Sequence, residues 1–434
     1  MSALDLCAAF GNVLRQPAAI TLPDTSDAAI TVYSCDVGGP SALCRNIRSW
    51  SGRRLFDGAM TGASSEVSEE DAKFKAACEA AERYSSSLLL PSEYLVAAYQ
   101  EIEGEAVDWT TLPRLSQEEL ADPRQMYVPF VPTDPMRWVR GLHIQSGQEK
   151  WLPTAITHLY PRLWSSEHFF VPISTGTALH SDEIRAVCSA INELVERDAI
   201  ALTWLLRRPL RRVTINEDLL AIMPPGIISL LRSREFLVYD ATTNIGVPTI
   251  YVRRFRPGNP KVANVIGCAS AFDYRTAIEK ALTEAVMISR TLELGAPGSM
   301  DDPMDCEAVH DGAFYMAPAE RASAFEFLDD NGTVELRTLM QREPVVVGMA
   351  DKLNWLIDCL TAAGMDIYIC NLTSEELQDV GLFCCRAVIP QIMPMSLSRR
   401  ARFLDTPRLH AYPAIEGLQR NIPSDINPFP QPFA

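Results

Sequence analysis

Residues 191–199 read INELVERDA and residues 77–84 read ACEAAERY, so the word Glu-x-x-Glu-Arg occurs twice in the chain. Two glutamates three positions apart share one face of an α-helix, and an arginine four positions after the first lies beside them. On a surface helix this pattern would be an ordinary ion-pair ladder. Here the flanking Ala, Cys, Leu, Val and Tyr residues indicate buried helices, and buried carboxylates require a partner or a metal ion.

Three long helices are predicted, and two of them contain this Glu-x-x-Glu-Arg motif. The predicted spans are about 69–88, 182–206 and 274–292, directly behind Ser68, Ser181 and Asp273. The third helix adds Lys280 and Glu284 in the segment EKALTEA. The carboxylates on these apolar helices are Glu79, Glu82, Glu193, Glu196 and Glu284. Such a set suggests Mg²⁺ that bridges carboxylates to nucleotide phosphates. The chain has no P-loop and no G-x-G-x-x-G, which argues against Walker-type and Rossmann-type nucleotide sites.

The segments between the helices predict strands. Runs rich in β-branched and aromatic residues are FLVYD at 236–240, PTIYVRRF at 248–255 and VVVGMA at 345–350. Residues 362–390 indicate a strand, a turn, a short helix and a second strand. The first fifty residues alternate short apolar and turn-rich pieces, which also suggests strands. The sequence therefore predicts a mixed α/β (α+β) fold.

Composition narrows the class of protein. The chain has 434 residues, of which 47% are hydrophobic, and a formal net charge of -16. This acidity argues against nucleic-acid binding and against an anionic membrane surface. No apolar stretch is long enough to span a bilayer, and the N-terminus does not resemble a secretory signal. Eleven cysteines without a C-x-x-C pair indicate free thiols rather than a structural zinc site. We therefore expect a cytoplasmic protein.

The three helices resemble the nucleotide site of the YcaO family, whose pattern is S-x-x-x-E-x-x-E-R, then E-x-x-E-R-D-A, then R-x-x-x-E. The resemblance extends from about Gly62 to the C-terminus. It includes the turn Ser174-Thr175-Gly176-x-Ala178, the tryptophan-centred segments 134–138 and 151–153, and the last strand in 381–394. It implies a single large YcaO domain with helices packed on mixed sheets and the nucleotide site between three helices. Within it, residues 1–60 would form a strand-rich N-terminal segment, 61–400 the ATP-binding core and 401–434 an extended Pro-rich tail.

The resemblance also implies cofactors and site residues. ATP and Mg²⁺ would be bound, with Glu79, Glu82, Glu193, Glu196 and Glu284 as metal ligands, some of which also orient the triphosphate. Arg83, Arg197 and Lys280 would neutralise phosphate charge, and Ser181 and Ser189 would contact the nucleotide. The chain departs from the family pattern at Gly62-Ala63-Ser64-Ser65, where Gly-Lys-Gly is usual, and at Lys75, Lys280 and Met287.

The C-terminal residues indicate a subfamily. Pro428, Pro430 and Pro432 form P-x-P-x-P in the ending NPFPQPFA, which resembles azoline-forming members of the family, the streptolysin-S-type maturase component above all. A disordered Pro-rich terminus is the alternative interpretation. Because proline fixes φ and removes backbone donors, such a segment is stiff before it docks. We expect it to place the terminal carboxylate of Ala434 in the active site, where it would act as a base.

The implied activity is that of an ATP-dependent cyclodehydratase. It would convert Cys, Ser or Thr of a ribosomally made precursor peptide to thiazoline or oxazoline by phosphorylating the backbone amide oxygen. The alternatives are a YcaO enzyme that makes thioamides or amidines, and a non-catalytic YcaO scaffold of an azole synthetase complex. Implied partners are the precursor peptide, an FMN-dependent dehydrogenase and a second copy of the chain in a homodimer. Because the first predicted helix begins near residue 69, we expect an E1-like partner protein to hold the leader of the peptide.

Overall fold

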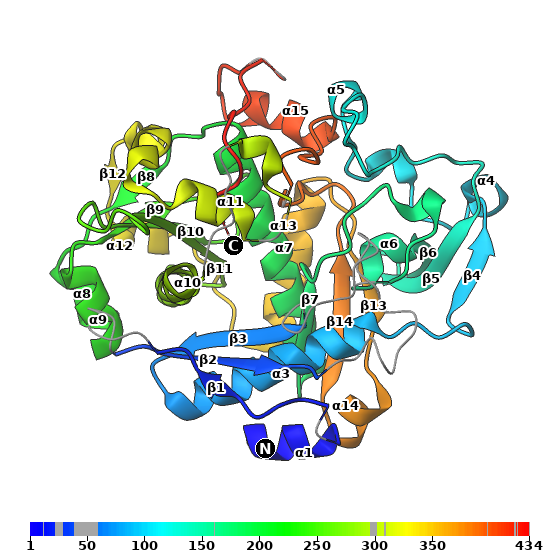
Figure 1. Cartoon of the computed structure of the whole chain (residues 1–434), viewed down its shortest axis with the longest axis horizontal. Helices are drawn as coiled ribbons and strands as arrows, with labels where there is room; N and C mark the ends of the chain where they lie inside the picture. The colour runs from blue at the N-terminus through cyan, green and yellow to red at the C-terminus, as the bar shows by residue number, and fades with distance from the viewer. Residues whose placement is uncertain are drawn as a thin grey trace.

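The computed structural model describes residues 1–11, 13–21, 29–38, 60–159, 161–295, 302–307, 310–396, 398–420, 422 and 424–433. In these ranges helices pack on three sheets within one domain, which confirms the predicted mixed α/β fold (Figure 1). None of the helices in these ranges is both long and apolar enough to cross a membrane. The ten cysteines they contain are free, and most of them are buried, as predicted.

The first sheet supports the first long helix. Its antiparallel strands are β1 (Ala18–Ala19), β2 (Thr31–Asp36) and β3 (Thr61–Glu66), and helix α3 (Glu69–Ser87) packs on them. Helix α3 begins as predicted, because the Ser68 side chain accepts a hydrogen bond from the Asp71 N–H at 3.3 Å. Before this sheet lies a helix that was not predicted, α1 (Ala3–Ala9), which Ser2 and Asp5 cap reciprocally.

The second sheet supports the third long helix. Its strand order is β11-β10-β9-β8-β12, and helix α10 (Tyr274–Leu294) packs against β11 and β10. The strands are β8 (Arg211–Val213), β9 (Phe236–Asp240), β10 (Thr249–Phe255), β11 (Asn264–Ser270) and β12 (Thr333–Val334). Strands β9 and β10 confirm the prediction from FLVYD and PTIYVRRF.

The third sheet supports the second long helix, α7 (Glu183–Leu205), which packs on β14 and β7. Its order is β4-β5-β13-β14-β7, and β6 also pairs with β5. The strands are β4 (Tyr94–Ala97), β5 (Met136–His143), β6 (Gln148–Pro153), β7 (Thr177–His180), β13 (Tyr368–Asn371) and β14 (Phe383–Val388). The N-cap of α7 is Asp182, whose Oδ1 accepts from the Arg185 N–H at 3.0 Å, so Ser181 lies one residue outside the helix start.

The shorter helices lie at the edges of these layers. The α-helices are α4 (Tyr99–Ile102), α5 (Gln117–Leu120), α6 (Thr154–Thr157), α8 (Glu217–Ile222), α9 (Pro225–Arg232), α11 (Asp311–Met316), α12 (Leu336–Met340), α13 (Met349–Ala362), α14 (Glu375–Asp379) and α15 (Pro407–Ile415). The 3₁₀ helices are η1 (Trp109–Thr111), η2 (Ser165–Glu167), η3 (Pro303–Asp305) and η4 (Ala319–Asp329). The order β13, α14, β14 confirms the prediction for residues 362–390.

The predicted strand at 345–350 is wrong. Val345 and Val347 are 100% and 95% exposed, and Gly348 is the N-cap of α13. The β-branched side chains favour an extended backbone, but a strand also needs a neighbour and a buried face. Within the part of the chain that the structure describes, residues 341–348 have neither.

The C-terminal segment is packed rather than loose. Residues 407–415 of the region predicted to be extended form helix α15, whereas the described residues after 426 belong to no helix or strand. Asn427 and Phe433 are each 1% exposed. The Asn427 N–H donates to the Leu205 carbonyl at 2.8 Å, and the Trp204 indole N–H donates to the Phe429 carbonyl at 3.2 Å. The boundaries 1–60, 61–400 and 401–434 stay a prediction.

Candidate functional site

One glutamate of each long helix is held by the backbone that precedes the helix. A backbone N–H donates to each of these carboxylates from β3, from the turn before β7 and from β11. The distances are 2.8 Å from Ala63 to Glu79, 3.0 Å from Gly176 to Glu193 and 2.9 Å from Cys268 to Glu284. The three strand-helix units therefore present their carboxylates in the same way.

A glycine stands the same number of positions before each of these glutamates, at Gly62, Gly176 and Gly267. A Cβ on Gly62 would lie 2.3 Å from the Ala76 carbonyl oxygen, and one on Gly267 would lie 2.3 Å from that of Ala281. Only glycine allows strand and helix backbones to approach this closely. This repeat is a sequence signal that helical periodicity alone did not reveal.

The arginines of the repeated Glu-x-x-Glu-Arg motif form ion pairs with the glutamates beside them. Arg83 donates to Glu79 at 2.6 Å and also to the Thr61 carbonyl. The Arg197 guanidinium lies 3.4 Å from both Glu193 and Glu196. The helical spacing therefore places each arginine next to the carboxylates as the sequence predicts.

The carboxylates of Glu82, Glu196 and Glu284 are half-buried and influence one another. Burial raises the pKa of Glu196 to about 8, and Glu284 and Glu193 add to the effect while Arg197 opposes it. Burial likewise raises the pKa of Glu284 to about 7. Burial, with the nearby charges of Glu193 and Glu79, raises the pKa of Glu82 well above its ordinary value. The helices thus concentrate more negative charge than Arg83 and Arg197 neutralise.

A cavity of about 330 Å³ opens beside α7 and α10. Of the predicted site residues, Ser189, Glu193, Glu196 and Lys280 line it, whereas Ser181 is not among the described residues that do. The predicted residues Glu79, Glu82, Arg83, Arg197 and Glu284 also lie outside the described lining. They join the site through the hydrogen bonds, ion pairs and charge interactions given above.

The sequence did not single out several lining residues, of which three bear on a ligand. Arg185 and Lys352 add positive charge to the cavity wall. Asn192, directly before Glu193, also lines the wall, and its buried Oδ1 has no hydrogen-bond partner within the described ranges. A buried polar atom without a partner points to a ligand in the cavity. Asn192 could have been assigned to the site from its position next to Glu193. Lys352 belongs to α13, and no local sequence pattern connects it with α7.

The carboxylates of the site fit Mg²⁺ only if a bound nucleotide supplies further ligands. No three His, Cys, Asp or Glu side chains of the described residues converge closely enough to hold a metal ion. Mg²⁺ in nucleotide enzymes commonly takes one or two carboxylates and completes its shell with phosphate oxygens and water. The clustered carboxylates with raised pKa values would be stabilised by such a cation.

Arg197 also lines a second, mostly apolar pocket. Arg197 and Arg386 line it together with apolar residues that include Leu194, Met393 and Met395. Arg386 is 5% exposed, and burial lowers its pKa to about 10. Its Nε has no hydrogen-bond partner among the residues that the structure describes. A buried guanidinium with a spare donor therefore faces this pocket.

The C-terminal segment reaches the same arginine. The Phe433 ring centroid lies 4.5 Å from the Arg197 guanidinium carbon. Pro430 and Pro432 are buried, and the Pro428 carbonyl accepts from Arg399 Nε at 3.0 Å. Ala434 lies outside the described residues. The P-x-P-x-P segment thus passes from Arg399 to the edge of the carboxylate cluster.

Comparisons with known proteins agree with this geometry. A family model described as YcaO cyclodehydratase, ATP- and Mg²⁺-binding, matches residues 64–393. The fold is similar to that of a heterocyclase in complex with substrate and cofactor, with a TM-score of 0.77 at 19% identity, over 100% of this chain and 58% of that chain. The chain thus spans little more than half the length of that heterocyclase.

Two further solved structures share the fold. One is YcaO from Methanopyrus kandleri bound with AMPPCP and Mg²⁺, with a TM-score of 0.60 at 16% identity over 87% of this chain and 85% of that one. The other is a chain of the E. coli microcin synthetase McbBCD complex with pro-MccB17 bound, with a TM-score of 0.61 at 13% identity over 96% of both chains. At these identities the likeness shows the fold alone.

Proposed function

The chain belongs to the YcaO family of ATP- and Mg²⁺-binding cyclodehydratases, and on this premise we propose that it is an azoline-forming, ATP-dependent peptide cyclodehydratase. Its substrate is a ribosomally made precursor peptide. Cys, Ser or Thr residues of that peptide become thiazoline or oxazoline rings.

The observation that carries this proposal is the half-buried carboxylate cluster beside a cavity whose wall carries three cationic side chains. Glu193 and Glu196 line the same cavity as Arg185, Lys280 and Lys352. A triphosphate carries several negative charges, so it needs cationic side chains, and a metal ion needs the carboxylates. The pKa values of Glu196 and Glu284 are raised because the protein alone does not neutralise these carboxylates, so a bound cation would stabilise them.

We assign the roles of the residues accordingly. Glu79, Glu82, Glu193, Glu196 and Glu284 would hold Mg²⁺ together with phosphate oxygens, one or two carboxylates to an ion, and the metal would neutralise phosphate charge. Arg83, Arg197 and Lys280 add positive charge around the triphosphate, with Arg185 and Lys352 on the cavity wall. Ser189 and Ser181 contact the nucleotide, Ser189 from within the lining and Ser181 from beside it.

The ring chemistry follows from the low reactivity of an amide. The thiol or hydroxyl of the substrate residue gives its proton to the base and attacks the preceding backbone carbonyl carbon, so that a C–S or C–O bond forms and the carbonyl oxygen becomes an oxyanion. That oxygen takes the γ-phosphoryl group of ATP, ADP is released, and the phosphorylated oxygen becomes a leaving group. The amide nitrogen then loses its proton, the C=N bond forms and phosphate departs. The protein orients the reactants and stabilises charge.

The C-terminal segment supplies a group close to this chemistry. We propose that Pro428, Pro430 and Pro432 direct the chain past Arg197, where Phe433 packs on the guanidinium, and that Ala434 follows into the active site as the base. The stiffness of the segment keeps the ordering cost low.

The same proposal includes partners. The heterocyclase with a related fold was solved with its substrate, and the microcin synthetase is a complex that binds pro-MccB17. We propose that this chain likewise acts on a precursor peptide that an E1-like partner holds by its leader. A homodimer and an FMN-dependent dehydrogenase that oxidises azolines complete the proposed assembly.

Reconstitution tests the function. The protein is mixed with the partner, the precursor peptide, ATP and Mg²⁺, and phosphate release is measured beside the peptide mass. We expect loss of one water for each phosphate released. Exchange of oxygen for sulfur would favour the thioamide alternative. A docking scaffold predicts that Glu196→Gln and wild type give equal phosphate release, and that result would refute the enzyme.

A further inference from the structure

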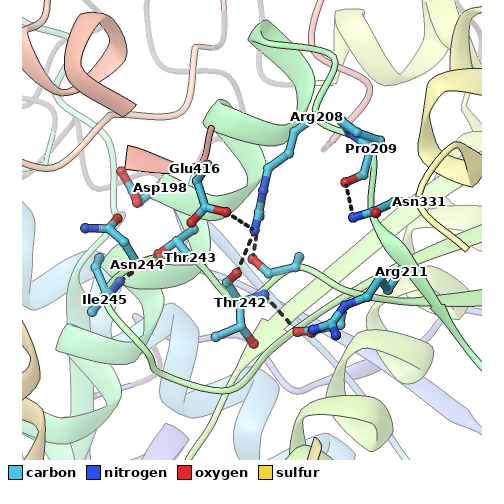
Figure 2. A network of polar contacts seen from close by, with 12 residues as sticks. Asp198, Arg208, Pro209, Arg211, Thr242, Thr243, Asn244, Ile245, Asn331 and Glu416 are labelled. Atoms are coloured by element: carbon cyan, nitrogen blue, oxygen red, sulfur yellow. Dashed lines mark hydrogen bonds and ion pairs between the residues drawn. The ribbon is translucent and has the colours of Figure 1, made fainter. Parts of the chain in front are cut away.

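A second cavity, of about 680 Å³, is separate from the nucleotide-side cavity. It lies between the segment after α7, the loop from β9 to β10 and the end of α15. Figure 2 shows its polar walls, with Arg208 at the centre between Glu416 and the backbone of Thr242. Its volume falls within the range of small-ligand sites.

One wall of this cavity presents two arginines that share a single buried carboxylate. Arg211 donates to Asp240 at 2.8 Å, and Arg342 lies 3.6 Å from the same side chain. Asp240 is only 4% exposed, whereas Arg211 and Arg342 are 32% and 47% exposed. One carboxylate cannot neutralise two guanidinium groups, so donors and positive charge remain directed at the cavity.

The opposite wall is rigid and offers acceptors. Arg208 donates to the carbonyls of Ala241 at 3.0 Å and Thr242 at 2.7 Å, and its guanidinium lies 3.6 Å from Glu416 (Figure 2). The Thr242 hydroxyl is fixed by the Tyr274 hydroxyl at 3.0 Å. These contacts fix the backbone of the loop, while the Glu416 carboxylate is 28% exposed and open to a donor.

We propose that this cavity binds an acidic segment of a peptide, with a Glu or Asp side chain of that segment on Arg211 and Arg342. Guanidinium groups recognise carboxylates through paired hydrogen bonds. A peptide also carries backbone N–H groups that donate to Glu416. A phosphate dianion fits less well, because Asp240 and Glu416 would repel its two charges more strongly than the single charge of a carboxylate. The inference rests on the proposed function in that peptides are its substrates, and it adds a docking site in a second cavity.

The local charge supports this occupant. Among the described lining residues, Arg208, Arg211 and Arg342 outnumber Asp240 and Glu416 by one, on a chain whose net charge is -16. The acidic protein surface would repel an acidic peptide, whereas this positively charged cavity would attract it. The peptide is therefore expected to bind at the cavity.

Fluorescence anisotropy tests the site without turnover. The probe is a fluorescein-labelled Gly/Ser peptide with adjacent Glu residues, compared with the same peptide carrying Gln. We expect the full chain to bind the Glu peptide, and Arg342→Gln and Arg211→Gln to weaken binding about tenfold or more. The matched control is Arg232→Gln, which removes one exposed arginine from α9, outside the cavity lining.

Equal binding of the Glu and Gln peptides, or an equal effect of Arg342→Gln and Arg232→Gln, would overturn the proposal. Complete displacement of the peptide by millimolar inorganic phosphate would reassign the cavity to inorganic anions and also overturn it. Nucleotide affinity is measured in parallel by calorimetry. If the protein binds nucleotide but not the peptide, only this peptide site is refuted. If Glu196→Gln leaves phosphate release unchanged while the peptide binds, only the proposed enzymatic function is refuted.

Discussion

Replacing Gly267 by alanine tests how strand β11 places Glu284. A Cβ at this position would lie 2.3 Å from the Ala281 carbonyl oxygen and 2.8 Å from the Ala285 nitrogen. Both atoms belong to the backbone of α10 and cannot rotate away. Strand and helix must therefore separate by about 1 Å to reach ordinary contact distances.

A separation of this size has two consequences. The hydrogen bond from the Cys268 N–H to Glu284, now 2.9 Å, would lengthen to about 4 Å, which is beyond hydrogen-bonding range. Overpacking typically costs about 1–3 kcal/mol, and we expect the free energy of unfolding to fall by that amount. Because this N–H lowers the pKa of Glu284, the variant should bind Mg·ATP optimally at a higher pH than wild type does.

The assays are urea unfolding followed by tryptophan fluorescence, and calorimetric titration with Mg·ATP over a range of pH. Gly258→Ala is the control, because a Cβ there meets no described atom within 4 Å. If Gly267→Ala matched Gly258→Ala in stability and in the pH dependence of binding, the close approach of β11 and α10 would not be what holds Glu284.

Further predictions concern pH, the segment near Arg197 and the apolar pocket. Burial raises the pKa values of Glu196 and Glu284 above 4.5, to about 8 and about 7, so their contribution to stability is complete at acidic pH and is lost as pH rises toward 8. Thermal unfolding should show this decline without nucleotide, and Mg·ATP should reduce it; a decline unaffected by Mg·ATP would count against a cation at these carboxylates. Phe433→Ala should lower ring formation at least about tenfold with ATP affinity kept, measured by peptide mass and calorimetry; unchanged ring formation would return the segment to a packing role. Arg386→Gln should reduce ring formation more than nucleotide binding, because its spare donor faces the apolar pocket; equal losses in both would indicate a structural role.

The sequence predicted the elements whose signals are local. The long helices and their caps at Ser68 and Asp273, the strands at 236–240 and 248–255, and the strand-helix-strand order in 362–390 all follow from spacing and residue type. The strand predicted at 345–350 failed because β-branched residues record a local preference, whereas a strand also needs a partner that the fold does not provide. The start of α7 was placed one residue early, since Ser181 and Asp182 both resemble N-caps.

The site was predictable only in part. Glu-x-x-Glu-Arg placed Arg83 and Arg197 beside their carboxylates, because i, i+3 and i+4 positions meet on any helix. Lys352 could not be assigned to the cavity, because α13 reaches α7 only through tertiary packing. The recurrent glycine before each bound glutamate was visible in the sequence, but its meaning depends on the close approach of strand and helix.

One turn of α7 connects the parts of the proposed mechanism. Glu193 and Glu196 face the nucleotide-side cavity, and Arg197, next in the chain, contacts both carboxylates and the Phe433 ring. Asp198 follows and is fully buried, with Arg408 of α15 bound to its carboxylate at 2.5 Å. Consecutive side chains of one rigid helix thus bind the cavity wall, the C-terminal segment and the helix that precedes that segment. Because phosphoryl transfer and ring closure act on the same amide, the nucleotide and the base must keep a fixed separation. In the proposed mechanism, residues 193–198 of α7 would hold both sides and so provide that separation.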